Sequence, residues 1–461
     1  MFKVTFCAVL MFGFFTSIVQ GADLLVPDEY ASIQLAIDSA EDGDAVIVSG
    51  GTYYEAINFN GKLISVVSVD GAQSTVIDAQ KNQSSSAVAF ISEEHSEDGF
   101  SSSLSGFTIR GGNAITGGGI KIEQASPLIE NCIVTENYSS SNGAGIFIDA
   151  SGASIIGTDI LNNDSGGAGG GIYIRYSFVT LSDCLIESNE ASNGGGVYVK
   201  DSPTLEFDNL TINQNEASSN GGGIYIKASS SQITDSSFLS NSANRGGAFF
   251  SYSEGNAQFS DCLFTANTAL DLGGAASIRS NGDVSFTICT FDSNIADSDC
   301  DGEGSGGAID IVNSMVVLED ITACANMSCD LLDDFSGDAY ELIGEISGCD
   351  EGTGACCGGT ACWDMTSEDC LAGGGVFLGG GSICDSEACD EIANVGSCCL
   401  GAFCVMTTES DCVAADGMFS GIDVQCEDTV CEDDCAADLN NNGSVDVDDL
   451  VLLISLWGAC P

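Results

Sequence analysis

The sequence predicts an all-β protein whose main part is a right-handed parallel β-helix solenoid, followed by small disulfide-rich modules and a short loop-and-helix module. A glycine triplet recurs eight times between residues 117 and 308, and its third residues are spaced 26, 26, 25, 27, 25, 27 and 33 residues apart. A nearly fixed period in this range is typical of stacked solenoids. Each triplet is followed by a run that alternates apolar and polar residues, which is the pattern of a half-buried strand. Parallel crossovers are right-handed, so we expect that hand.

Each coil is expected to contain a strand directly after its triplet and a second strand that stops at an asparagine. "GGGIYIRYS" at 169–177 and "VTLSDCLIESN" at 179–189 are one such pair. Because asparagine tolerates left-handed turn geometry and can hydrogen-bond along a stack, we expect a buried ladder in one corner. Its members are Asn137, Asn163, Asn189, Asn215, Asn241, Asn267 and Asn294.

Four cysteines, Cys132, Cys184, Cys262 and Cys289, each lie five residues before a ladder asparagine. This is an inward phase, so most are expected to be small buried fillers of the core. Cys262 and Cys289 occupy adjacent coils and can bond only if the local geometry allows it.

The N-terminal part reads as an export signal followed by a capped solenoid end. Residues 1–22 have the charged start, apolar stretch and small-residue cleavage point of a signal peptide. Residues 23–115 form the cap and first coils, with a short amphipathic helix around residues 31–40, and residues 116–350 form the repeated coils. Capping is expected because an open parallel edge promotes aggregation.

Two segments carry a family resemblance. "YASIQLAIDSAEDGDAVIVSGGTYYEAINF" at 30–59 resembles the N-terminus of pectin-lyase-like right-handed β-helix proteins. "FLSNSANRGGAFF" at 238–250 is similar to the repeats of polymorphic outer-membrane proteins. The two resemblances imply the fold over about residues 25–330 and leave the activity open.

Composition limits the classes of function. The formal net charge is −58, and such a field repels phosphate backbones, so nucleic acid is excluded as a partner. No apolar run in the mature chain approaches the ~18 residues of a membrane span. We therefore expect an extracellular or cell-surface protein with no transmembrane segment.

The C-terminal third changes character at Cys356. The spacing CC-x4-C-x7-C-x13-C-x4-C occurs twice, 42 residues apart, and predicts two tandem modules at 351–393 and 394–432. Because each module has few apolar residues, disulfides are expected to replace a core. A zinc site is the weaker alternative, since paired CxxC knuckles are missing.

The last module, 433–461, contains a candidate Ca²⁺ loop. Oxygen-bearing residues occupy positions 1, 3, 5, 7, 9 and 12 of a twelve-residue loop, with Gly443 at the sharp turn. They are Asp438, Asn440, Asn442, Ser444, Asp446 and Asp449. The loop resembles the EF-hand of dockerins, but dockerins carry two loops and this chain has one, so cohesin-type binding is left open.

No catalytic residues are identified. The paired-Asp, His-Gly and Arg-Lys set of polygalacturonases is missing, as is the signature of pectin methylesterases. Instead, an aromatic column two residues after the triplets runs beside a basic column four residues after them. Aromatic rings can stack on sugars and cations can pair with uronate or sulfate groups, so these columns predict a substrate-binding surface. Its candidate residues are Tyr173, Arg175, Tyr198, Lys200, Tyr225 and Lys227.

The predicted function is a non-catalytic β-helix protein for adhesion, binding an anionic polysaccharide or a cell-surface partner. The alternative is a polysaccharide lyase or hydrolase attached through its dockerin-like end. An enzyme predicts an acidic pocket beside the basic column, whereas an adhesin predicts a flat face. The aromatic column has a purely structural alternative as well, since outward rings also stack to stabilise a sheet.

Overall fold

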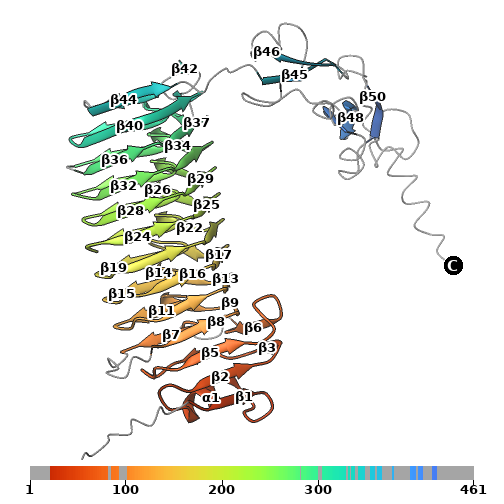
Figure 1. The fold of residues 1–461 in the computed structure, drawn as a ribbon, viewed down its shortest axis with the longest axis vertical. Helices are drawn as coiled ribbons and strands as arrows, with labels where there is room; N and C mark the ends of the chain where they lie inside the picture. The colour runs from red at the N-terminus through yellow and green to blue at the C-terminus, as the bar shows by residue number, and fades with distance from the viewer. Residues whose placement is uncertain are drawn as a thin grey trace, which may run out of the picture. The chain divides into compact units, whose positions relative to one another are not determined.

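The chain divides into two compact units, Met1–Gly348 and Cys349–Pro461. The computed structural model describes residues 21–80, 85–92, 101–280, 282–298, 304–328, 331–332, 334–337 and 341–347 of the first unit, and six strands of the second (Figure 1). Residues 1–20 and the candidate calcium loop at 438–449 lie outside the described residues.

The first unit is a parallel β-solenoid with three sheets, and its coils are stacked one upon another (Figure 1). One coil contains β14 (Tyr138–Asn142), β15 (Ile146–Asp149), β16 (Ser154–Ile156) and β17 (Asp159–Leu161). An 11-stranded sheet contributes one strand to each of eleven coils. This confirms the predicted all-β parallel solenoid, which extends beyond the eight coils marked by triplets.

The 11-stranded sheet contains the eight strands that follow the triplets, together with β4 (Ile57–Asn58), β7 (Val88–Ile91) and β43 (Phe335–Gly337). In chain order its strands are β4, β7, β11 (Ile120–Glu123), β15, β19 (Ile172–Arg175), β23 (Val197–Lys200), β27 (Ile224–Lys227), β31 (Phe249–Tyr252), β35 (Ala276–Arg279), β39 (Ile309–Val312) and β43.

Most strands of the 10-stranded sheet lie just before a glycine triplet in the chain. This sheet was not predicted from the sequence. It contains β10 (Asn113–Thr116), β14, β18 (Asp164–Ser165), β22 (Glu190–Asn193), β26 (Glu216–Asn220), β30 (Ser242–Arg245), β34 (Thr268–Leu272), β38 (Ile295–Ala296), β41 (Met327–Ser328) and β42 (Leu331–Leu332), the last pairing antiparallel.

The 23-stranded sheet closes each coil. It contains β1 (Asp23–Val26), β2 (Ala45–Val48), β3 (Gly51–Tyr53), β5 (Ser65–Ser68), β6 (Thr75–Asp78), β8 (Ser103–Ser105), β9 (Thr108–Arg110), β12 (Leu128–Glu130), β13 (Ile133–Thr135), β16, β17, β20 (Val179–Ser182), β21 (Leu185–Glu187), β24 (Leu205–Asp208), β25 (Thr211–Asn213), β28 (Ser230–Thr234), β29 (Ser237–Leu239), β32 (Asn256–Ser260), β33 (Leu263–Thr265), β36 (Asp283–Thr287), β37 (Thr290–Asp292), β40 (Met315–Cys324) and β44 (Glu341–Ser347).

The corners of a coil are made by single residues with positive φ. The segment 179–189, expected as one strand, is two strands because Asp183 bends the chain with φ 55°. At the ladder corner the left-handed residue is Ser188, with φ 54°, and not Asn189. The sequence prediction was wrong on both points, since the polar ladder side chain and the left-handed backbone belong to neighbouring residues.

The glycine triplets mark where the backbone of adjacent coils comes closest. The first glycine of every triplet has φ between 60° and 73°. A Cβ on the second glycine of one triplet, Gly195, would lie 2.4 Å from the carbonyl oxygen of Glu216 and 2.6 Å from that of Gly222. The first position therefore requires glycine for its conformation, and Gly195 is required for space.

The asparagine ladder is confirmed and continues to Asn326. Each described member donates its side-chain amide to Oδ1 of the next member, as Asn189 does to Asn215 at 3.0 Å. The same Oδ1 accepts the backbone N–H of Asn189 at 3.1 Å. Buried amides are thus satisfied along the stack, as buried polar groups must be.

The one helix among the described residues, α1 (Ile33–Ser39), lies at the N-terminal end of the solenoid, where the sequence predicted a cap (Figure 1). Ile33, Ala36 and Ile37 are buried, and Ser32 caps the helix by accepting from the N–H of Leu35 at 3.3 Å. At the C-terminal end of the helix, Lys62 donates to three backbone carbonyl oxygens, those of Ile37, Asp38 and Ala40, each at 2.8 Å.

The four inward cysteines, Cys132, Cys184, Cys262 and Cys289, are free thiols buried in the core, as expected for most of them. Cys324, at the end of β40, is disulfide-bonded.

The second unit contains two antiparallel three-stranded sheets. The first has β45 (Gly354–Gly358), β46 (Ala361–Met365) and β47 (Val376–Phe377); the second has β48 (Val395–Leu400), β49 (Phe403–Thr408) and β50 (Met418–Ile422). In the backbone register, Cys357 is opposite Cys362 in the first sheet, and Cys399 is opposite Cys404 in the second. The backbone therefore repeats where the cysteine spacing repeats.

Candidate functional site

The candidate site is on the outer face of the 11-stranded sheet. Arg175, Lys200 and Lys227 are in register on β19, β23 and β27. We call these three residues the basic stripe. Because the strands are parallel and adjacent coils are about 4.8 Å apart, the three cations form a column along the solenoid.

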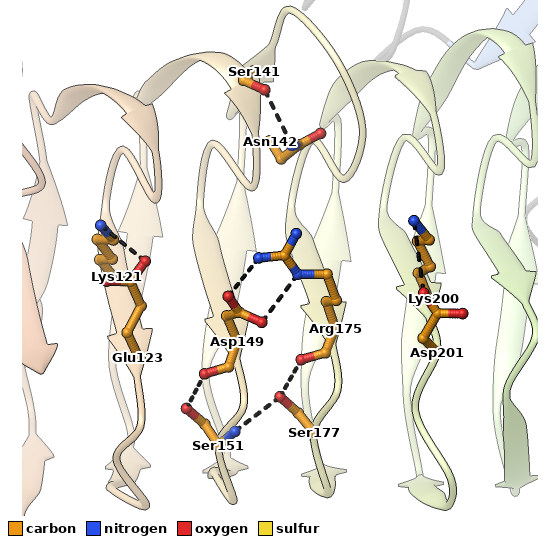
Figure 2. A network of polar contacts seen from close by, with 10 residues as sticks. All are labelled: Lys121, Glu123, Ser141, Asn142, Asp149, Ser151, Arg175, Ser177, Lys200 and Asp201. Atoms are coloured by element: carbon orange, nitrogen blue, oxygen red, sulfur yellow. Dashed lines mark hydrogen bonds and ion pairs between the residues drawn. The ribbon is translucent and has the colours of Figure 1, made fainter. Parts of the chain in front are cut away.

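Carboxylates neutralise most of the stripe. Arg175 binds Asp149 of the preceding coil through two hydrogen bonds of 3.0 and 2.5 Å, and Lys200 lies 3.6 Å from Asp201 (Figure 2). The hydrogen bond to Asp149 raises the pKa of Arg175. Lys227 has no carboxylate partner within the part of the chain that the structure describes, and its ammonium lies 5.5 Å from the ring centre of Tyr252.

The predicted aromatic column forms an aromatic ladder beside the stripe. It consists of Phe147, Tyr173, Tyr198, Tyr225 and Phe250, with ring centres 5.3, 5.2, 4.7 and 5.1 Å apart. Four rings are buried and Tyr198 is half-buried. Their faces stack on one another, so they do not offer a free ring face to a sugar.

Burial also sets the protonation of the ladder tyrosines. It raises the pKa of Tyr225 to about 12 and raises the pKa values of Tyr173 and Tyr198. The phenols therefore stay neutral at physiological pH. The arrangement supports the structural reading of the rings, while their hydroxyl edges stay candidates for ligand contact.

Two exposed aromatic residues on the other side of the stripe were missed by sequence reasoning. Tyr176 and Phe178 are 55% and 63% exposed. Arg175 lies with its guanidinium carbon 5.4 Å from the Tyr176 ring centre, which is cation–π distance. We call Tyr176 and Phe178 the aromatic platform. Their signal in the sequence is weak, because they occupy positions five and seven after one triplet and recur in no other coil.

A serine ladder holds the turn beneath the stripe. Ser177 accepts the N–H of Ser151 at 3.1 Å and donates to the carbonyl oxygen of Arg175 at 2.6 Å (Figure 2). Ser202 and Ser229 repeat the pattern beneath Lys200 and Lys227. These serines lie six residues after the third position of their triplets, so the signal was present in the sequence and was overlooked.

A hollow of about 450 Å³ adjoins the stripe at this turn. Among its lining residues are Asp201, Pro203, Ser230, Glu254 and Asn256. It opens where the serine ladder ends, since Ser253 and Glu254 both have positive φ and widen the next turn. The face beside the stripe therefore contains a shallow, open hollow.

The described residues contain no group of three or more His, Cys, Asp or Glu side chains placed to hold a metal ion. The candidate Ca²⁺ ligands lie outside them. None of the helices in the described part of the chain is long and apolar enough to span a membrane.

Comparison with known proteins agrees with the solenoid. A family model described as "Right handed beta helix region" matches residues 65–238. Among curated proteins, none matches this chain. Among solved structures, one match is the catalytic unit of a thermostable GH87 alpha-1,3-glucanase from Streptomyces thermodiastaticus. It is 11% identical, with a TM-score of 0.32 over 71% of this chain and 68% of that one.

Proposed function

We propose that this is an exported, non-catalytic β-helix protein that binds an anionic polysaccharide of a cell surface or matrix through the basic stripe and the aromatic platform. The observation that carries the proposal is the exposure of Tyr176 and Phe178 on the coil of Arg175, where Tyr176 lies at cation–π distance from the first of three in-register cations. Exposed aromatic residues in a patch with charged neighbours are a common mark of an interaction surface.

The chemistry of the two features is complementary. An aromatic face packs against the C–H face of a sugar ring, and a guanidinium or ammonium pairs with a carboxylate or sulfate on the same sugar. The net charge of −58 repels polyanions in general, so binding depends on the local cations of the stripe, around which charges more than about 8 Å away are screened at physiological ionic strength. Lys227 is the strongest candidate for direct ion pairing, since Asp149 and Asp201 already neutralise its neighbours.

We further propose that the terminal module binds one Ca²⁺ through Asp438, Asn440, Asn442, Ser444, Asp446 and Asp449. Alternating oxygen ligands around Gly443 support this assignment. The ion would order the module and leave the solenoid unchanged.

One observation favours a second candidate function, a polysaccharide lyase or hydrolase. The hollow beside the stripe places two carboxylates, Asp201 and Glu254, around a space large enough for a sugar ring. Paired carboxylates can perform general acid and base catalysis. The binding function is preferred because the stripe and the platform extend beyond this hollow.

The test is retention of the intact protein on a panel of immobilised uronate-containing, sulfated and neutral polysaccharides, with product assays run in parallel. Retention without release of reducing sugar or unsaturated uronate is the expected result. Turnover that disappears in Asp201→Asn or Glu254→Gln would replace the proposal with the enzyme. Absence of both retention and turnover would rule out a carbohydrate role for this face.

A further inference from the structure

Cys262 and Cys289 are stacked directly on adjacent coils. Cys262 joins β32 to β33, and Cys289 joins β36 to β37 in the next coil. Leu263 pairs with Thr290 in parallel register, and Thr290 donates its N–H to the carbonyl oxygen of Cys262 at 2.9 Å. Adjacent parallel strands are about 4.8 Å apart, which lies within the Cα separations of 4.4 to 6.8 Å that disulfides span.

The thiol contacts distinguish Cys289 from the other three inward cysteines. Cys132, Cys184 and Cys262 each direct their sulfur toward a carbonyl oxygen of the preceding coil, at 3.7, 3.6 and 3.5 Å. Cys289 directs its sulfur toward the carbonyl oxygen of Thr287 in its own coil at 3.4 Å, and the residue next to its thiol in the preceding coil is Cys262. No other two of the four free, buried cysteines among the described residues lie on consecutive coils.

We propose that Cys262 and Cys289 are an oxidation site, and that in the exported protein they form a disulfide that joins two consecutive coils. The reaction uses a small-molecule disulfide or the disulfide of a thiol–disulfide oxidoreductase as oxidant. Both side chains are buried in the finished solenoid, so the exchange takes place before these coils close.

The exchange has two steps. The Cys262 thiolate attacks one sulfur of the oxidant, forms a mixed disulfide and releases one thiolate. That thiolate takes the proton of Cys289, whose sulfur then attacks Sγ of Cys262 and releases the second thiolate, which takes up the proton that Cys262 lost on ionising. Two cysteine thiols are oxidised and one disulfide is reduced to two thiols. In the open coils either cysteine can be the first to attack, and the products are the same.

The distribution of basic residues gives a direct test. Trypsin cleavage after Arg245 and Arg279 releases the peptide 246–279, whose single cysteine is Cys262. No Lys or Arg follows Arg279, so Cys289 stays in the fragment 280–461. The intact exported protein is alkylated in denaturant without reduction, digested and analysed by mass spectrometry. The proposal predicts that peptide 246–279 appears only after reduction.

Cys184 is an internal control, because peptide 176–200 contains it as the single cysteine and should appear alkylated without reduction. In Cys289→Ser, peptide 246–279 should also appear without reduction. Release of alkylated 246–279 from the unreduced wild type would overturn the proposal, as would its retention in Cys289→Ser. A disulfide closing a loop of this length raises the melting temperature by about 4 °C, so Cys289→Ser should lower it by that much relative to Cys184→Ser.

Discussion

Asn215 donates its side-chain amide to Oδ1 of Asn241 at 3.0 Å, and both side chains are fully buried. Asn215 also donates to the carbonyl oxygen of Ile186 at 2.8 Å. From the coil below, its own Oδ1 accepts both the backbone N–H and the side chain of Asn189. The side chain of Asn215 thus links three consecutive coils through hydrogen bonds.

Replacing Asn215 with Ala should therefore destabilise the solenoid by about 3 kcal/mol, because several buried donors and acceptors lose their partners. Urea unfolding of the wild type and the variant measures the difference. Asn213→Ala, which removes one partly buried hydrogen bond to Glu187, is the matched control and should cost about 1 kcal/mol. Equal effects of the two substitutions would contradict the role of the ladder.

Two left-handed corners, one in a triplet and one after β27, should respond in opposite ways to exchange of glycine and alanine. Gly194→Ala forces a side chain onto φ 60° and brings Cβ to 2.5 Å from the carbonyl oxygen of Val197, so a loss of about 3 kcal/mol is expected. Ala228→Gly relieves a left-handed alanine with φ 48° and should stabilise by up to about 1 kcal/mol. The same unfolding assay measures both, and a stabilising Gly194→Ala would refute the account of the corner.

Asp310 should make stability depend on pH. Burial raises the pKa of its carboxyl above 3.8, and the ion pair with Arg279 at 2.7 Å offsets this only in part. The native state therefore binds the proton more tightly than the unfolded state does. The stabilisation that Asp310 contributes is complete below pH 3.8 and is lost as the pH rises through the native pKa. Asp310→Asn should flatten that decline in the free energy of unfolding measured from pH 3 to 8.

The control for this measurement is Asp261→Asn, which changes an exposed carboxylate in another coil. It should leave the pH dependence as in the wild type. If Asp310→Asn and the wild type lose stability in parallel over the whole range, Asp310 does not carry the effect.

The terminal module should bind one Ca²⁺ per chain. Calorimetric titration of the metal-free protein is expected to give one site, and Asp438→Ala should abolish it because the first loop position supplies a carboxylate ligand. Asp433→Ala, just outside the loop, should bind as the wild type does. Unchanged Ca²⁺ binding by Asp438→Ala would show that the loop is not the calcium site.

The repeat could be predicted from the sequence because every coil meets the same environment. The triplet spacing and the asparagine phase both report a physical requirement that recurs once per coil, and the coils and the ladder were found where these signals indicated. After the last triplet the asparagine ladder continues at an irregular spacing, so its last member, Asn326, was missed.

The positions of the left-handed corners could not be predicted, because pairing between stacked coils imposes a positive φ there whatever residue is present. Ile288 and Ala266 adopt φ 53° and 54°, although neither residue favours the left-handed region. Their neighbours pair in register with the coils above and below, and this pairing holds the bend.

The binding face could be predicted only in part, for a related reason. Alternation placed Tyr173 and Tyr198 outward, yet it could not show that the coil spacing would stack their rings at 5.2 Å. Exposure of Phe178 depends on the path of one turn, which has no repeated signature.

The most direct test of the proposed binding face compares Tyr176→Ala/Phe178→Ala with Tyr54→Ala on the polysaccharide that retains the wild type best. Tyr54 is 66% exposed at the N-terminal end of the solenoid and is a matched control for the loss of a surface aromatic. Removal of two stacking rings should weaken binding by at least tenfold, since stacking contacts contribute about 1 kcal/mol each. Tyr54→Ala should bind as the wild type does; equal affinity of all three proteins would contradict the assignment of the platform.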